Sequence, residues 1–273
     1  MNTIEVNGLH IGYQRAGEGP SLVLLHGFIQ DSRYWRPQIE DLSRDFTVIA
    51  WDTPGCGQSS DPPESFGMAE YADTLAEFLD ALGVGAAHVV GLSWGGTLAQ
   101  CFYGRHPGGV RSLVLADTYA GWQGSLSIEV VEERIARCQR DSELPADEWV
   151  PGWIPELLTA GAPEKLGREV ISIMSDFHPA GYRIMTQVLA DTDTRDQLPS
   201  IGVPTLLLWG RDDRRSPFSV AEAIRDSIPG ARLVVIENAG HLSSAEQPGR
   251  FNAEVRGFCR SVPTEHPASP GAL

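Results

Sequence analysis

Residues 91–95 read Gly-Leu-Ser-Trp-Gly and place a single serine, Ser93, between two glycines. Two β-branched residues, Val89 and Val90, precede the motif, and a helix-forming run follows it. A strand, a tight turn and a helix in this order strain the backbone at the serine and raise its hydroxyl above the sheet edge. The glycines let strand and helix approach closely, and the helix N-terminus favours developing negative charge. The pattern predicts that Ser93 is a nucleophile.

A serine nucleophile needs a base, an acid that orients the base, and donors for the oxyanion. Of the 7 histidines in the chain, His241 follows the last predicted strand, in a loop from which it can reach over the sheet end. Two carboxylates, Asp213 and Asp117, also follow predicted strands. Both are therefore candidates for the acid.

The elements that must position these side chains alternate between strands and helices. A hairpin is predicted over residues 2–6 and 9–14, around the turn signal Asn7-Gly8. Buried strands are predicted over residues 21–25, 46–51, 87–91, 110–116, 205–209 and 232–236. Helices are predicted over residues 35–42, 69–82, 94–106, 217–228 and 247–260. Such alternation is typical of a mostly parallel sheet that helices cover on both faces.

Residues 120–190 differ, because helical patterns follow one another there without a strand between them. We interpret this segment as an inserted helical cap on a core formed by residues 1–119 and 191–261. The Pro-rich residues 262–273 are predicted to be a flexible tail. Large side chains in the cap segment could wall a pocket over the strand ends, or could only pack the cap onto the core. The candidate pocket residues are Trp122, Trp153, Phe177, His178 and Tyr182.

Composition limits the classes of partner. The chain has 273 residues, which is enough for one large α/β domain, and a formal net charge of −15. That charge argues against nucleic acids and anionic membranes as partners. The N-terminus lacks the pattern of a signal peptide, no apolar run is long enough to span a bilayer, and the 4 cysteines form no C-x-x-C pair. We therefore expect a cytoplasmic protein with reduced thiols, either a monomer or a homodimer.

Five motifs, taken in order, resemble those of the α/β-hydrolase fold family. The resemblance extends over residues 1–260 and implies a mostly parallel eight-stranded sheet, helices on both faces and an inserted helical cap. It is specific for the fold and much less so for the substrate. The motifs are His26-Gly27-Phe28, Asp52-x-x-Gly55-x-Gly57-x-Ser59, Gly91-x-Ser93-x-Gly95, Gly210-Arg211-Asp212-Asp213 and Gly240-His241.

The resemblance also implies roles for individual residues. His241 matches the catalytic histidine of the family, and Asp213 matches the acid, with Asp117 as the alternative acid. The oxyanion hole would be formed by the backbone N–H groups of Phe28 and Trp94. The resemblance implies no metal and no cofactor. We therefore expect a cofactor-free serine hydrolase that cleaves small carboxylic esters or lactones through an acyl-enzyme.

Trp94, directly after the serine, suggests alternatives within the fold. The turn that carries Ser93, called the nucleophile elbow, resembles that of proline iminopeptidases. Those enzymes carry His-Gly-Gly-Pro where this chain has His26-Gly27-Phe28-Ile29. Haloalkane dehalogenases and epoxide hydrolases share the x-Trp-Gly pattern but use aspartate as the nucleophile. Carbon–carbon bond hydrolysis, a cofactorless oxygenase and a non-enzymatic ligand receptor remain open. We also expect the Trp94 indole to lie near the acyl pocket and to favour compact acyl groups.

Overall fold

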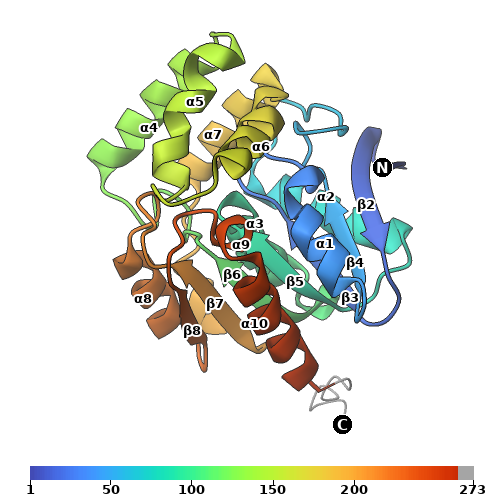
Figure 1. The fold of residues 1–273 in the computed structure, drawn as a ribbon. Coiled ribbons are helices and arrows are strands. Elements are labelled where there is room, and N and C mark those ends of the chain that lie inside the picture. The colour runs from blue at the N-terminus through green and yellow to red at the C-terminus, as the bar shows by residue number, and fades with distance from the viewer. Residues whose placement is uncertain (264–273) are drawn as a thin grey trace.

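A computed structural model describes residues 1–263 as an eight-stranded sheet with the strand order β1-β2-β4-β3-β5-β6-β7-β8 (Figure 1). Strand β2 pairs antiparallel with β1 and β4, and all other neighbouring strands run parallel. The predicted fold class is confirmed. The strands are β1 (Asn2–Val6), β2 (Leu9–Ala16), β3 (Ser21–Leu25), β4 (Thr47–Trp51), β5 (Ala87–Leu92), β6 (Val110–Ala116), β7 (Thr205–Gly210) and β8 (Arg232–Ile236).

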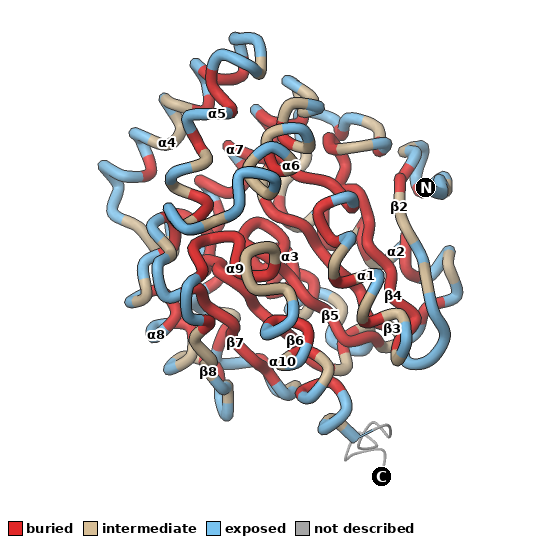
Figure 2. The backbone as a smooth tube through the Cα atoms, viewed as in Figure 1, coloured by how far each residue is buried: buried red, intermediate tan, exposed pale blue. Residues whose placement is uncertain are grey.

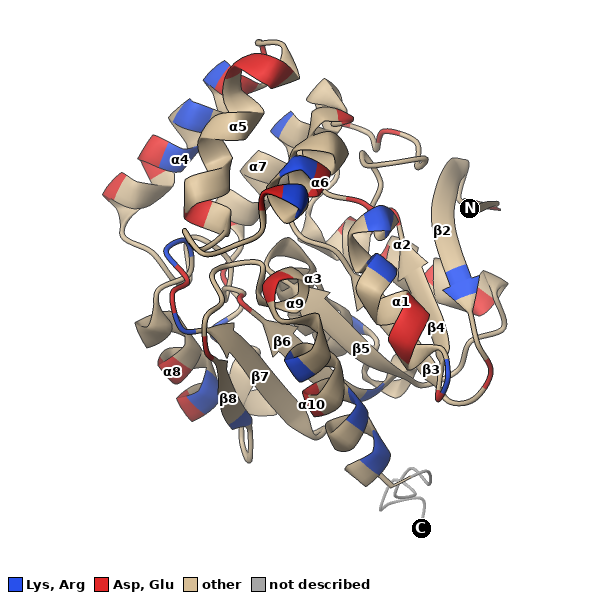
Figure 3. Cartoon of the chain, in the orientation of Figure 1, with Lys and Arg blue, Asp and Glu red and all other residues tan. Residues whose placement is uncertain are grey.

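The hairpin turn and the buried central strands have the features that the sequence predicts. Asn7 and Gly8 both have positive φ angles, 51° and 78°, as a type I′ turn requires. Every residue of β4, β5 and β7 is buried, which is typical of parallel strands covered on both faces (Figure 2). The charged residues lie mainly on the helices and loops around these strands (Figure 3).

Helices α1 and α10 pack together on one face of the sheet, and α2 and α3 pack together on the other (Figure 1). No helix within residues 1–263 combines the length and apolar character needed to cross a bilayer. The core helices are α1 (Arg36–Leu42), α2 (Met68–Ala81), α3 (Trp94–Arg105), α8 (Phe218–Ser227), α9 (Ser243–Glu246) and α10 (Pro248–Ser261). Short 3₁₀ helices cover Ser32–Trp35, Pro107–Gly109 and Leu198–Ser200.

Two predicted helices begin one residue later in the structure, each with a proline in its first turn. The helix expected from residue 35 begins at Arg36, after a 3₁₀ turn, with Pro37 in its first turn. The helix expected from residue 247 begins at Pro248, and the separate short helix α9 lies before it. Proline favours the first turn of a helix because its missing N–H has no partner there in any case.

Four helices lie between β6 and β7 in the chain, and Figure 1 shows them stacked beyond the carboxyl ends of the parallel strands. They occupy the segment predicted to be a cap, whose boundaries at residues 120 and 190 stay a prediction. Of the predicted tail, residues 264–273 lie outside the described residues. The four helices are α4 (Ile128–Asp141), α5 (Ala146–Leu157), α6 (Glu164–Ser175) and α7 (Pro179–Asp191).

Candidate active site

Ser93 occupies a strained turn between β5 and α3, with φ 52° and ψ −113°. Its backbone N–H donates to the Ala116 carbonyl on β6 at 2.9 Å, which holds the turn against the sheet. The flanking glycines are required by close contact. A Cβ atom at Gly91 would lie 2.2 Å from the Gly95 carbonyl oxygen, and one at Gly95 would lie 2.2 Å from the Leu25 carbonyl oxygen. The Gly-x-Ser-x-Gly spacing therefore produces this serine geometry.

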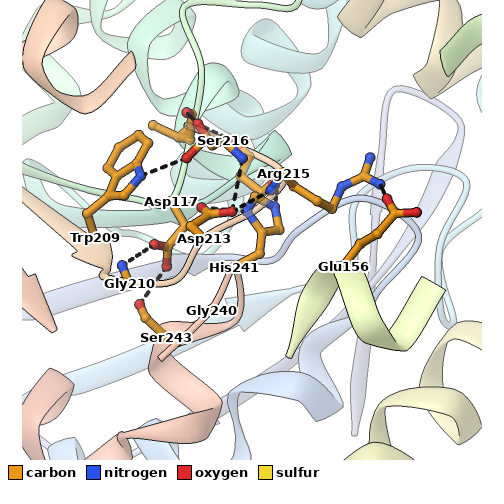
Figure 4. Close-up of polar contacts among 12 residues, drawn as sticks. Asp117, Glu156, Trp209, Gly210, Asp213, Arg215, Ser216, Gly240, His241 and Ser243 are labelled. Carbon is orange, nitrogen blue, oxygen red and sulfur yellow. Dashed lines mark hydrogen bonds and ion pairs between the residues drawn. The ribbon is translucent and has the colours of Figure 1, made fainter. Parts of the chain in front are cut away.

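Ser93, His241 and Asp213 form one hydrogen-bonded chain. His241 Nε2 lies 2.9 Å from Ser93 Oγ, and His241 Nδ1 lies 2.9 Å from Asp213 Oδ2. The three side chains come from loops after β5, β7 and β8, whose carboxyl ends meet at one edge of the sheet. Figure 4 shows the Asp213 and His241 side chains meeting, and both are almost completely buried. This arrangement can pass a proton from serine to imidazole while the carboxylate orients the ring.

The second oxygen of Asp213 is held by its own loop. Oδ1 accepts the backbone N–H groups of Arg215 at 2.8 Å and Ser216 at 2.9 Å (Figure 4). The Ser216 hydroxyl in turn donates to the Thr118 carbonyl at 2.6 Å. These contacts fix the carboxylate and leave Oδ2 for the histidine.

Asp117, the alternative acid, makes different contacts. Its Oδ1 accepts the Gly210 N–H at 2.7 Å, and its Oδ2 accepts the Ser243 hydroxyl at 2.5 Å (Figure 4). Within residues 1–263 it has no hydrogen bond to His241. Burial, and next the charge of Asp213, raise the pKa of Asp117 well above its usual range. Asp117 thus ties together the loops that carry Asp213 and His241.

The two backbone donors expected for an oxyanion hole are free. Within residues 1–263, the N–H groups of Phe28 and Trp94 donate no hydrogen bond. The loop before Phe28 is braced by His26, whose Nε2 accepts the Thr53 N–H at 2.9 Å and whose Nδ1 lies 2.8 Å from the Gly27 carbonyl. Burial lowers the pKa of His26. With Nε2 accepting, the neutral ring donates from Nδ1.

A small cavity lies against Ser93 and His241. Its volume is about 20 Å³, which is room for about one water molecule. The cavity is lined by Gly27, Phe28, Gln30, Ser93, Tyr119, Trp122, Trp153, Leu157, Met174, Leu189, Arg215, His241 and Leu242. Of the five candidate pocket residues, Trp122 and Trp153 are in this wall.

The other three candidates do not line the cavity. Phe177 packs edge-on against Trp149 and Tyr182, with ring centroids 5.1 and 5.5 Å away. The Tyr182 ring stacks on Trp149 at 5.3 Å. His178 contacts the loop after β4 at the surface, where its Nδ1 lies 2.7 Å from Asp61 Oδ1. The rings of Phe177 and Tyr182 therefore serve the packing of the segment, the alternative that the sequence left open.

Two features of the site were not expected from the sequence. The Trp94 indole does not line the cavity, because it is fully buried and packs edge-on against Tyr71 of α2, with centroids 5.2 Å apart. Arg215 does line the cavity and is only 7% exposed. It stands in a run of charged residues, 211–215, that is typical of an exposed loop. Only the position two residues after Asp213, within the turn that holds the acid, could have indicated it.

Comparisons with known proteins agree with this fold. The family model described as alpha/beta hydrolase fold matches residues 20–167 and 178–248. A thermophilic esterase from Thermogutta terrifontis superposes with a TM-score of 0.85 at 31% identity, covering 95% of this chain and 97% of the esterase. The 3-oxoadipate enol-lactonase 1 of Acinetobacter baylyi is 28% identical over 249 residues, 89% of this chain and 90% of the relative. A proline iminopeptidase of Heyndrickxia coagulans is 25% identical over 293 aligned residues, covering 95% of this chain and 98% of the relative. The chain belongs to the α/β hydrolase fold family.

Proposed function

We propose that this protein is a cofactor-free serine hydrolase that cleaves small carboxylic esters or lactones through an acyl-enzyme. One observation carries the proposal. Ser93, on a strained elbow beside a cavity, is joined to His241 and through it to buried Asp213 by two contacts of 2.9 Å. A serine hydroxyl with an oriented imidazole base is the arrangement that acyl transfer requires.

In the proposed reaction, Ser93 Oγ attacks the substrate carbonyl while His241 Nε2 takes its proton. Asp213 holds the imidazole with Nδ1 protonated and stabilises the imidazolium. The free N–H groups of Phe28 and Trp94 donate to the oxyanion. The protonated His241 then donates to the leaving alcohol, and the acyl group stays on Ser93. A water molecule deprotonated by His241 attacks the acyl-enzyme, releases the acid and regenerates the serine.

The small size of the cavity favours compact substrates over large ones. A space of about 20 Å³ holds about one water molecule, so side chains of its wall must move even for a compact substrate. Relatives named as an esterase and an enol-lactonase support the same substrate class. We place the reaction in the cytoplasm, which the four buried free thiols favour (Cys56, Cys101, Cys138 and Cys259).

Covalent labelling tests the nucleophile. A fluorophosphonate should add once to the folded protein, at Ser93, and Ser93→Ala should prevent both labelling and hydrolysis of p-nitrophenyl esters and lactones. Ser244→Ala is a matched control. This buried hydroxyl lies 2.6 Å from the Tyr34 hydroxyl and does not belong to the proposed catalytic triad of Ser93, His241 and Asp213. The variant should retain labelling. Labelling elsewhere, or hydrolysis that survives Ser93→Ala, would overturn the proposal.

A further inference from the structure

Arg215 is a buried positive charge in the wall of the proposed active site. It is 7% exposed and lines the same cavity as Ser93 and His241. Its backbone N–H donates to Asp213 Oδ1 at 2.8 Å, so its position is set by the turn that holds the proposed acid. Burying a guanidinium is costly unless anions and hydrogen-bond acceptors surround it. The acceptors around Arg215 are therefore informative.

The guanidinium of Arg215 is only partly satisfied. Nη1 donates to Glu156 Oε2 on α5 at 2.8 Å, and the group lies over the Trp153 ring, 4.4 Å from its centre. Figure 4 shows the side chain extended from the Asp213 loop toward Glu156. Within residues 1–263, Nε and Nη2 donate no hydrogen bond. Because a guanidinium offers five N–H donors, Arg215 can bind a further acceptor.

A second arginine lies behind it without a carboxylate partner. Arg134 on α4 donates from Nη2 to the Arg215 carbonyl at 2.7 Å and from Nη1 to the Tyr119 hydroxyl at 3.1 Å. Its guanidinium lies over the rings of Tyr119 and Trp122, at 5.4 and 5.3 Å from their centres. Both rings line the cavity. No ion pair joins Arg134 to a carboxylate in the described part of the chain.

Few carboxylates form ion pairs with the arginines around this wall. Arg137 shares Glu156 with Arg215, at 2.5 Å, and lies 3.6 Å from Asp141. Within residues 1–263, the ion pairs of Arg137 and Arg215 are with two carboxylates, Glu156 and Asp141, and Arg134 makes none. Burial, and next the charge of Arg134, lower the pKa of Arg215 from its ordinary value. An anion bound at Arg215 would relieve this repulsion.

We infer that the cavity selects esters or lactones that also carry a carboxylate, and that Arg215 is the residue that binds it, with Arg134 adding charge behind. This inference rests on the proposed function, because it places the reacting carbonyl at Ser93 and the carboxylate at Arg215. The planar guanidinium matches the two oxygens of a carboxylate. If Arg215 only tied α5 to the core through Glu156, anionic and neutral substrates would be affected alike.

A pair of esters of similar acyl length separates these roles. We compare kcat/KM for the 4-nitrophenyl monoester of glutaric acid with that for 4-nitrophenyl valerate. The wild type should favour the anionic ester at least about 10-fold. Arg215→Met should lower this preference by about 10- to 100-fold, the worth of a hydrogen bond to a charged group, mainly through KM of the anionic ester. Arg211→Met is the matched control. This arginine of the same loop is exposed and paired with Glu237, so the preference should stay unchanged.

Other outcomes are equally decisive. Equal kcat/KM for the two esters in the wild type, or an equal loss for both in Arg215→Met, would overturn the inference and leave the hydrolase proposal intact if Ser93→Ala still abolishes turnover. Absence of turnover together with failure to label Ser93 would overturn the proposed function itself. If Arg215→Met does not fold, Arg134→Met takes its place. A smaller fall in the preference would support the inference, and an unchanged preference would overturn it.

Discussion

The proposed triad and the wall of the cavity that faces it are held in place by different means. Ser93 is fixed by glycines two residues away on either side, and Asp213 by N–H groups two and three residues ahead. In the wall, Trp153 donates to Asp141 at 2.9 Å, and Arg215 reaches Glu156, 59 residues earlier. The backbone of the turns that carry Ser93 and Asp213 is thus tightly constrained, whereas the proposed specificity depends on side-chain contacts between separate helices and loops.

The largest effect should come from the acid. Asp213→Asn should lower kcat for a Ser93-dependent ester by about 10⁴-fold, because the amide favours the wrong tautomer of His241. The Asn Oδ1 can still accept the N–H groups of Arg215 and Ser216, so the melting temperature should change little. The measurement is kcat beside a thermal unfolding curve. A loss below tenfold in a folded variant would contradict the assignment of the acid.

Gly95 tests whether close backbone contact constrains the turn that carries Ser93. Gly95→Ala would place a methyl group 2.2 Å from the Leu25 carbonyl oxygen, and backbone atoms cannot move aside easily. We expect the free energy of unfolding to fall by about 3 kcal/mol or more. Gly257→Ala in α10 meets no atom within 4 Å and should stabilise the protein by up to about 1 kcal/mol. Chemical denaturation measures both, and equal stability of the two variants would contradict the close-contact argument.

The same difference explains what could be predicted from the sequence. The strands, the elbow and the neighbourhood of Ser93, Asp213 and His241 follow from short motifs whose spacing already determines the backbone. The cavity wall does not, because an aromatic residue in a helical segment packs equally well toward the cavity or toward its neighbours. Phe177 and His178 were expected in the wall and lie elsewhere, whereas Arg215 lines the cavity and was not among the candidate pocket residues.

Trp94 tests the same difference, because it belongs to the turn at Ser93 but its side chain was expected in the wall of the cavity. Its indole packs against Tyr71 and is fully buried. Trp94→Leu should therefore lower the free energy of unfolding by about 2 kcal/mol, through lost packing, and leave the preference among acyl chain lengths unchanged. Melting temperatures and kcat/KM over a series of ester chain lengths test this. A shift toward bulkier acyl groups would place the indole in the acyl pocket after all.

The smallest effect on activity should come from Asp117. Asp117→Asn can keep both contacts, because the amide oxygen can accept the Gly210 N–H and the amide nitrogen can donate to the Ser243 hydroxyl. We expect kcat to fall less than about tenfold. Asp117→Ala, which leaves both partners unpaired, should instead lower stability by about 1–3 kcal/mol. A loss of kcat in Asp117→Asn as large as in Asp213→Asn would make Asp117 the acid.

The pH dependence of stability gives Asp117→Asn a second test. Burial and the charge of Asp213 raise the pKa of Asp117 in the folded protein above its ordinary value of 3.8. Between 3.8 and the raised value, the folded protein keeps a proton that the unfolded chain releases. Folding is therefore favoured by this group at low pH, and its contribution is lost as the pH rises toward the folded pKa.

Asparagine does not titrate, so the Asp117→Asn variant lacks this pH-dependent loss of stability. Its melting temperature relative to the wild type should rise as the pH increases from the ordinary value of 3.8 toward the raised pKa of Asp117. A difference that stays constant or falls as the pH rises above 3.8 would show that the pKa of Asp117 is not raised in the folded protein.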